Sequence, residues 1–129
     1  NDFNISKEST LGFVINGGVN PITVGQKGYF EVPFNCDVVG WSISCGDVTG
    51  SIVVDIWLDT NSYYVTPALS AANSIAGNQK PTITETHKNQ NLELTAWTGS
   101  LYKGDWLTPY VESNDTIKEV YLFLRVEKT

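Results

Sequence analysis

The chain has 129 residues, a length that fits one domain able to bury a hydrophobic core without metals or disulfides. Its net charge of −6 argues against binding to nucleic acid or to anionic membrane surfaces, because both are bound mainly through Lys and Arg side chains. No apolar run approaches the roughly 18 residues that a membrane-spanning helix needs, so we expect no membrane insertion.

The composition favours strands over helices. Eleven Gly and five Pro separate apolar stretches rich in Val, Ile, Thr, Tyr, Phe and Trp, and there is no Met. We therefore predict an all-β fold: an antiparallel two-sheet β-sandwich, jelly-roll-like, with seven or eight strands. Residues 1–10 are expected to form a polar N-terminal arm or linker, and residues 11–129 a single domain.

Three strands are predicted early in the chain, over residues 11–15, 28–34 and 38–45. Pro33 cannot donate a ladder hydrogen bond, so the second of these strands lies at a sheet edge or ends there. The alternation of the third strand predicts an inner face formed by Val39, Trp41, Ile43 and Cys45.

The next strand, over residues 51–58, has two distinct faces. The side chains of Ile52, Val54, Ile56 and Leu58 form a wholly apolar face. The opposite face carries Asp55 and Asp59 on either side of Trp57. This second face is expected to be solvent-exposed, part of an interface, or a site.

Residues 59–91 form the longest irregular stretch, which Asn, Pro and Gly interrupt repeatedly. Short strands are expected at 63–65 and 82–86, with a helical turn within 68–75. Three further strands are predicted, over 92–97, 106–111 and 120–127. In the last one, the aliphatic side chains predicted to be core are Val120, Leu122, Leu124 and Val126.

Several segments resemble small β-sandwich domains of bacteriophage virion proteins, found in tail fibres, tail tips and capsid-surface proteins. They are Gly28-Tyr-Phe-Glu-Val-Pro-Phe-Asn-Cys36, Gly50-Ser-Ile-Val-Val-Asp-Ile-Trp57 with Asp59-Thr60, Lys80-Pro81, Leu94-Thr-Ala-Trp-Thr98, Gly104-Asp105 and the final strand. The resemblance implies a virion component, often trimeric, that meets the host surface or covers the capsid. Leu58 departs from it, since the family tends to have a charged residue after the tryptophan.

Candidate catalytic groups are few. His87 is the only histidine, and no serine lies in a sequence typical of a strained nucleophile turn. A pairing of Cys36 with His87 would need a third, orienting group. Asp55 and Asp59 are about 13 Å apart along an extended strand, more than the roughly 5 to 10 Å used by glycoside hydrolases. We therefore expect no enzyme.

No metal site or cofactor is predicted. Zinc would need more Cys and His ligands than Cys36, Cys45 and His87 provide. Calcium is the alternative, because Asp59 and Asn61 offer oxygen ligands near a loop. The two cysteines lie at opposite ends of one predicted strand, so two buried thiols are favoured over a disulfide.

The aromatic residues are the best functional lead, because rings stack on sugars and also dominate protein interfaces. A ligand-binding group is predicted in and beside loops: Tyr63, Tyr64, Tyr102, Asp59 and Asn61. The outward parity of a second group predicts a subunit interface or a second packed layer: Trp57, Trp97, Tyr121 and Phe123.

We therefore expect a non-catalytic binding domain of a phage virion that attaches to a host-surface receptor, a saccharide in the favoured case. The alternative is a structural capsid decoration or fibre protein whose aromatic faces make subunit contacts. A homo-oligomer is expected, with a trimer favoured, and the partners are a host glycan or other virion proteins. The expected location is the particle surface, after assembly in the host cytoplasm.

Overall fold

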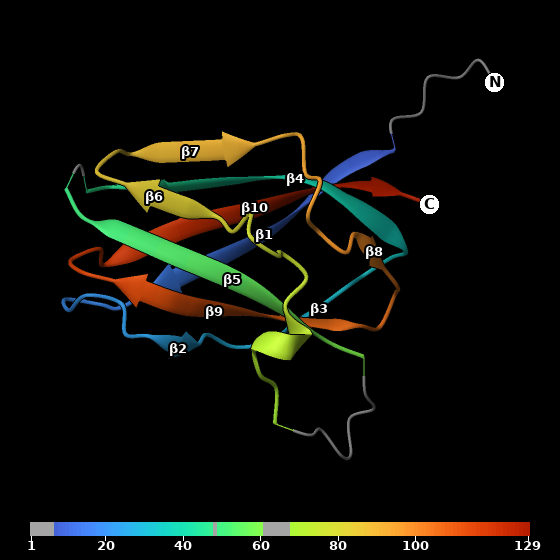
Figure 1. Ribbon diagram of the computed structural model, residues 1–129, viewed down its shortest axis with the longest axis horizontal. Helices are drawn as coiled ribbons and strands as arrows, with labels where there is room; N and C mark the ends of the chain where they lie inside the picture. Colours follow the sequence, from blue (N-terminus) through green and yellow to red (C-terminus); the bar gives the residue numbers. More distant parts are fainter. Residues whose placement is uncertain (1–6, 48, 61–67) are drawn as a thin grey trace.

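The computed structural model describes residues 7–47, 49–60 and 68–129. Within these ranges the chain forms two antiparallel sheets and one short 3₁₀ turn, η1 (Ala71–Asn73), so the predicted all-β class is confirmed. Figure 1 shows the two layers, with β5 and β9 in front of β1, β10 and β4.

The first sheet, called sheet A here, has β10 and β4 at its centre. Its strands run in the order β1 (Glu8–Asn16), β10 (Glu119–Lys128), β4 (Cys36–Cys45) and β7 (Lys88–Asn91). A two-residue strand, β8 (Ser100–Leu101), also pairs with the beginning of β4.

Sheet B has β9 and β5 at its centre. Its strands run in the order β2 (Gly25–Gln26), β9 (Trp106–Asn114), β5 (Ser51–Asp59) and β6 (Thr82–Thr84). The short β3 (Phe30–Glu31) also pairs with β9. The expected count of seven or eight strands depends on how the two-residue elements β2, β3 and β8 are treated.

Inner-facing side chains of both sheets form one hydrophobic core. Its fully buried members include Ile43, Ile52, Val54, Ile56, Ile83, Leu107, Val111, Val120, Leu122 and Leu124. The predicted inner faces of β5 and β10 are confirmed for every position except Leu58, which is partly buried against the core. Burying an aliphatic side chain of this size contributes about 1.5–3 kcal/mol, so this alternation supplies much of the driving force for folding.

Two strand boundaries differ from the prediction near the N-terminus. Strand β1 already begins at Glu8, where its residues pair with the end of β10. The predicted strand over 28–34 is reduced to β3, and it ends before Pro33 as the missing N–H requires. Val32 is buried in this segment, and both Phe30 and Phe34 pack against the core.

A register shift corrects the predicted inner face of β4. Arg125 pairs with Gly40 while Val126 pairs with Val38, so β4 has an extra residue at this point. The bulge turns Val39 outward, where it is exposed, and Val38 takes its place in the core. Trp41, Ile43 and Cys45 are buried as predicted.

The predicted strand over 92–97 is wrong. The strand in this region is the wholly polar β7, at the end of the stretch predicted to be irregular, and residues 92–97 are themselves irregular. The backbone N–H groups of Thr95 and Ala96 donate to Oε1 of Gln79, at 2.8 and 2.6 Å, instead of to a neighbouring strand. Hydrophobic alternation alone therefore misplaced this strand.

Both cysteines are free and buried, at the two ends of β4, which agrees with the favoured prediction. Burial raises the pKa of both thiols, and the charge of neighbouring Asp37 raises that of Cys36 further.

Adjacent residues on β10 provide a test of the two faces of sheet A. Leu122 is 0% exposed and Phe123 is 42% exposed. Leu122→Ala leaves a cavity and is expected to lower the free energy of unfolding by about 2–5 kcal/mol. Phe123→Ala is expected to lower it by less than about 1 kcal/mol, because the ring already contacts solvent. Urea denaturation followed by tryptophan fluorescence measures both, and a larger loss for Phe123→Ala would contradict the assignment of faces.

Candidate functional site

The outer face of sheet A carries a regular grid of side chains, which the cross-strand register defines. In one row, Phe123 of β10 lies opposite Gly12 of β1 and Ser42 of β4. Ser42 in turn pairs with Gln90 of β7. Directly paired residues lie on the same side of a sheet, so Phe123 and Gln90 stand on either side of a small serine.

The neighbouring row repeats this arrangement. Tyr121 of β10 lies opposite Val14 of β1 and Ser44 of β4, and Ser44 pairs with Lys88 of β7. The large side chains of β10 and β7 therefore border a strip of serines along β4.

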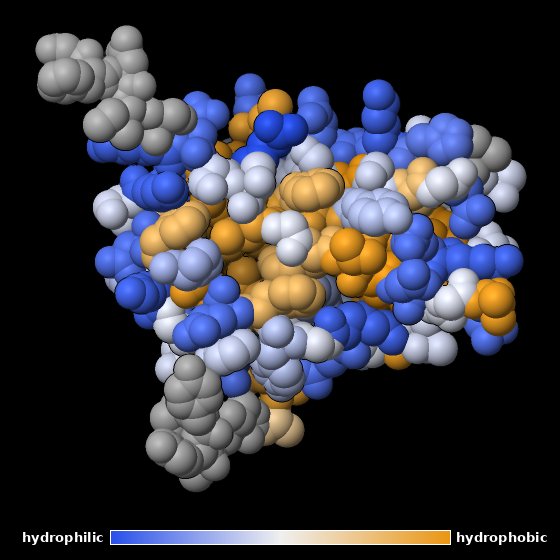
Figure 2. Space-filling model, turned by 180° about the vertical axis from the view of Figure 1, so that it is seen from behind, coloured by the Kyte–Doolittle hydropathy of each residue, from blue (hydrophilic) through white to orange (hydrophobic). Residues whose placement is uncertain are grey.

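Apolar side chains gather at the centre of this face (Figure 2). Val14, Tyr121 and Phe123 are all exposed there. A Cβ atom on Gly12 would lie 3.1 Å from Cε1 of Phe123, so the ring rests directly on the backbone of β1. Glycine at this position lets one side of the aromatic ring lie against the sheet, and the other side of the ring then faces solvent.

A hollow of about 530 Å³ lies between β10 and β7. Its lining residues are Ser42, Ile43, Ser44, Lys88, Asn89, Gln90, Phe123 and Arg125. One aromatic ring is thus combined with hydroxyl, amide, ammonium and guanidinium groups. This is the mixture of apolar surface and a few placed polar groups that is typical of small-ligand sites. We call it the β10–β7 hollow.

Arg125 is oriented by Ser42 at the floor of this hollow. Its Nε and Nη2 atoms donate to Oγ of Ser42, at 3.2 and 3.1 Å. In the described part of the chain, the ion pairs involve neither Arg125 nor Lys88. The guanidinium therefore keeps N–H donors for a ligand.

At the other end of the face, Glu119 is held by two neighbours. The Tyr121 hydroxyl donates to it at 2.6 Å, and Nδ2 of Asn16 donates at 2.8 Å. The hydrogen bond to the carboxylate raises the pKa of the Tyr121 phenol. The hydrogen bond to Glu119 thereby holds the Tyr121 side chain at this end of the face.

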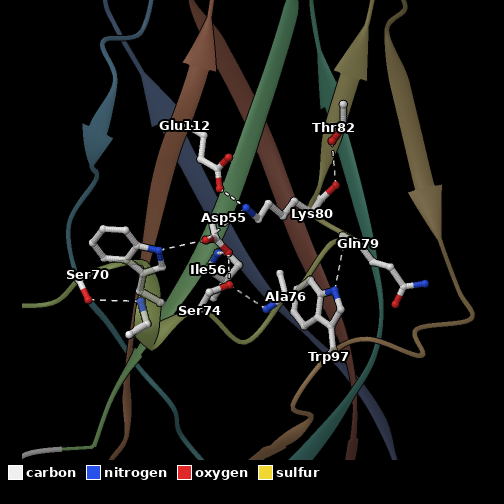
Figure 3. Close-up of polar contacts among 12 residues, drawn as sticks. Asp55, Ile56, Ser70, Ser74, Ala76, Gln79, Lys80, Thr82, Trp97 and Glu112 are labelled. Carbon is white, nitrogen blue, oxygen red and sulfur yellow. Dashed lines mark hydrogen bonds and ion pairs between the residues drawn. The ribbon is translucent and has the colours of Figure 1, made fainter.

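The outer face of sheet B is organised differently, around a buried carboxylate (Figure 3). Asp55 is 1% exposed. It accepts hydrogen bonds from the backbone N–H of Ile56 at 2.8 Å, from Nε1 of Trp57 at 3.1 Å and from Oγ of Ser74 at 2.6 Å. These donors satisfy the carboxylate, so we assign it a structural role.

Lys80 connects this carboxylate to β9. Its Nζ lies 3.9 Å from Oδ2 of Asp55 and donates to Glu112 (Figure 3). The hydrogen bond to Glu112 raises the pKa of the Lys80 ammonium, and the charge of Asp55 acts in the same direction, against a smaller opposing effect of burial. Together, Asp55 and Lys80 join β5, β9 and the segment over residues 70–80.

Of the two tryptophans in the predicted interface group, one is buried and the other is partly buried. Trp57 is 6% exposed and stacks on Tyr110 with ring centroids 4.1 Å apart. Trp97 is partly buried against the core and donates from Nε1 to the backbone oxygen of Gln79, as Trp41 does. Of the two predicted alternatives, the position of these tryptophans fits a second packed layer and not a subunit interface. Tyr121 and Phe123 of the same group are exposed on sheet A.

The predicted loop group is only partly described. Tyr63, Tyr64 and Asn61 lie outside the described residues. Asp59 is buried at the end of β5 and pairs with Trp106 of β9. Tyr102, which is 62% exposed, begins the turn that leads into β9. The structure thus brings Asp59 and the Tyr102 turn to the same end of sheet B.

The candidate catalytic and metal-binding groups are placed as follows. His87 is exposed, with Nδ1 3.3 Å from the backbone oxygen of Cys45, whereas Cys36 lies at the opposite end of β4. Asp55 and Asp59 are both buried. Among the described residues, no three His, Cys, Asp or Glu side chains gather in a way that could hold a metal ion.

Sequence reasoning missed Lys88, Gln90, Ser42 and Arg125 as site residues. The first two belong to β7, whose wholly polar sequence has no hydrophobic alternation to mark it as a strand. Ser42 and Ser44 could have been found, because they alternate with the buried Ile43 and Cys45.

The chain matches no protein-family profile and no curated protein sequence. No helix in the described residues is both long and apolar enough to cross a membrane. The resemblance to virion domains therefore stays a prediction, and the function is argued from the geometry.

Asp55 provides a test of the sheet B network. Asp55→Asn keeps the shape but places an NH₂ group against N–H and O–H donors. Because hydrogen bonds to a charged group contribute about 1.5–3 kcal/mol, we expect a loss of about 2–4 kcal/mol in the free energy of unfolding. Glu112→Gln, the control, changes only a partly exposed pair and is expected to cost about 1 kcal/mol or less. Equal urea midpoints for the two variants would contradict the structural role of Asp55.

Proposed function

We propose that this chain is a non-catalytic binding domain of a bacteriophage virion, and that the outer face of sheet A attaches to a saccharide on the host surface. The β10–β7 hollow is the observation that carries the proposal. It combines an exposed aromatic ring with hydroxyl, amide and cationic groups on rigid strands.

This combination suits a sugar ring. The C–H face of a hexose packs against an aromatic ring, while its hydroxyl groups need both donors and acceptors. Phe123 offers the flat apolar surface, and the amide of Gln90 with the hydroxyls of Ser42 and Ser44 offers donors and acceptors. All four residues lie on strands, which hold them in place before a ligand arrives.

The virion part of the proposal rests on the resemblance described above and on the order of strands. The order β1-β10-β4-β7 faces β2-β9-β5-β6, and the chain changes sheets repeatedly. Counting β2 and β3 as one interrupted strand and setting β8 aside gives eight strands in two four-stranded sheets. This supports a jelly-roll-like sandwich, an architecture used by viral capsid and lectin domains. Its place on the particle surface, after assembly in the host cytoplasm, follows from the same proposal.

The second candidate is a structural role, as a capsid decoration or fibre protein. It is favoured by the exposed strip of Val14, Tyr121 and Phe123, since aromatic and aliphatic side chains on a flat face are also typical of subunit contacts. A trimer is compatible with both candidates. In the saccharide proposal, it would join weak sites into a stronger attachment.

A glycan array of the purified domain tests the proposal, with the oligomeric state measured beforehand by light scattering. We expect saturable binding that Phe123→Ala weakens at least about ten-fold, equivalent to about 1.4 kcal/mol, because the ring supplies the stacking surface. Tyr102→Ala is the matched control, since it removes an exposed aromatic ring from the Tyr102 turn.

The outcomes separate the candidates. Binding lost in Tyr102→Ala but kept in Phe123→Ala would move the site to the end of sheet B and contradict the assignment to sheet A. Absence of binding, together with an oligomer that Phe123→Ala dissociates, would favour the structural role.

A further inference from the structure

The charges around the β10–β7 hollow differ in sign from those of the whole chain. The chain has 14 acidic and 8 basic residues apart from its histidine, which gives a net charge of −6. Lys88 and Arg125 both line the hollow, whereas its lining includes no Asp or Glu. An acidic protein therefore presents a local positive site beside the exposed ring of Phe123.

The hydrogen bonding of Arg125 leaves it suited to an anion. A neutral hydroxyl, that of Ser42, holds one edge of the guanidinium. The second N–H of Nη2 and one N–H of Nη1 form the neighbouring end of the planar guanidinium, and such a pair of donors matches the two oxygens of a carboxylate. No ion pair of the described residues occupies this end of the guanidinium.

The nearby carboxylates lie outside the hollow. Glu8 and Glu127 line a separate hollow on the other side of Arg125. Glu119 is held by Tyr121 and Asn16 at the far end of the face. The space between Arg125 and Lys88 therefore favours a ligand anion more than the positions beside Glu8, Glu127 and Glu119 do.

From this geometry we infer that the β10–β7 hollow recognises an acidic saccharide, whose carboxylate lies between Arg125 and Lys88 while its ring packs on Phe123. The inference rests on the proposed function and specifies its ligand class. In the register, Phe123 and Ser42 form one row of the outer face. Arg125 lies in the next row on one side, opposite Gly40, and Lys88 lies in the next row on the other side, opposite Ser44. The two cations thus lie on opposite walls of a strip whose floor is formed by small side chains.

Matched pairs of oligosaccharides test the inference by calorimetry at low ionic strength. Each pair has the same linkage and length, one member built of neutral hexoses and the other of the corresponding uronic acids. We expect the uronic acid form to bind about ten-fold or more tightly, and added salt to reduce this advantage, because charge pairs in a partly exposed site are screened. A sulfated oligosaccharide of the same length is the third arm.

Three charge-neutralising variants locate the site. Arg125→Gln and Lys88→Gln are each expected to weaken binding of the uronic acid form about five-fold or more beyond their effect on the neutral form, because only the acidic form has the carboxylate. Lys103→Gln is the control, because it removes the same charge from the turn before β9 and should leave both affinities unchanged. Urea midpoints of all three variants check that the fold is retained.

Several outcomes would overturn the inference. Equal binding of the neutral and acidic members, unchanged in Arg125→Gln and Lys88→Gln, would reject the acidic ligand and leave the proposed function standing. An equally large loss of affinity for the uronic acid form in Lys103→Gln would show that net charge, and not the hollow, determines the preference. If the sulfated oligosaccharide binds more tightly than the uronic acid form, the assignment of a carboxylate as the preferred anion is rejected. No binding of any saccharide would reject the proposed function together with the inference.

Discussion

The alternation of β10 is the constraint on which the rest of the structure depends. This strand lies between β1 and β4, so both of its edges are paired and its side chains can point only to the core or to the outer face of sheet A. Val120, Leu122, Leu124 and Val126 take the core positions. Because a shift of one residue would place these four side chains in water, the register that builds the core also sets Phe123 and Arg125 on the outer face.

The two sheets use their outer faces in opposite ways. On sheet B, the Asp55 carboxylate takes three hydrogen bonds from its own chain, and Tyr110 covers the indole of Trp57. On sheet A, the central strip of serines between β10 and β7 is open, and the cations along it lack carboxylate partners among the described residues. A face with satisfied polar groups stabilises the fold, whereas a face with free donors and an exposed ring is suited to a partner.

Much of the fold could be predicted from the sequence, because strict alternation marks β5 and β10 as strands with one buried face. The bulge in β4 could not, since no property of Val38, Val39 or Gly40 distinguishes the residue that is turned outward. The polar strand β7 could not be predicted, because its side chains face solvent and show no hydrophobic alternation. The same exposed polar side chains make β7 suitable for a binding site. The alternation of residues 92–97 was misleading, because hydrogen bonds to Gln79 hold them in an irregular conformation.

For the candidate site, the parity of Tyr121 and Phe123 was visible in the sequence, but their neighbours were not. Lys88 and Gln90 join them through pairing between strands that are more than 30 residues apart, which only the fold reveals. The most direct measurement is a titration of the isotope-labelled domain with the tightest saccharide from the array, followed by amide chemical shifts. A binding site in the β10–β7 hollow predicts changes centred on Ser42, Lys88, Phe123 and Arg125. Changes centred on the turn at Tyr102, with sheet A unaffected, would contradict it.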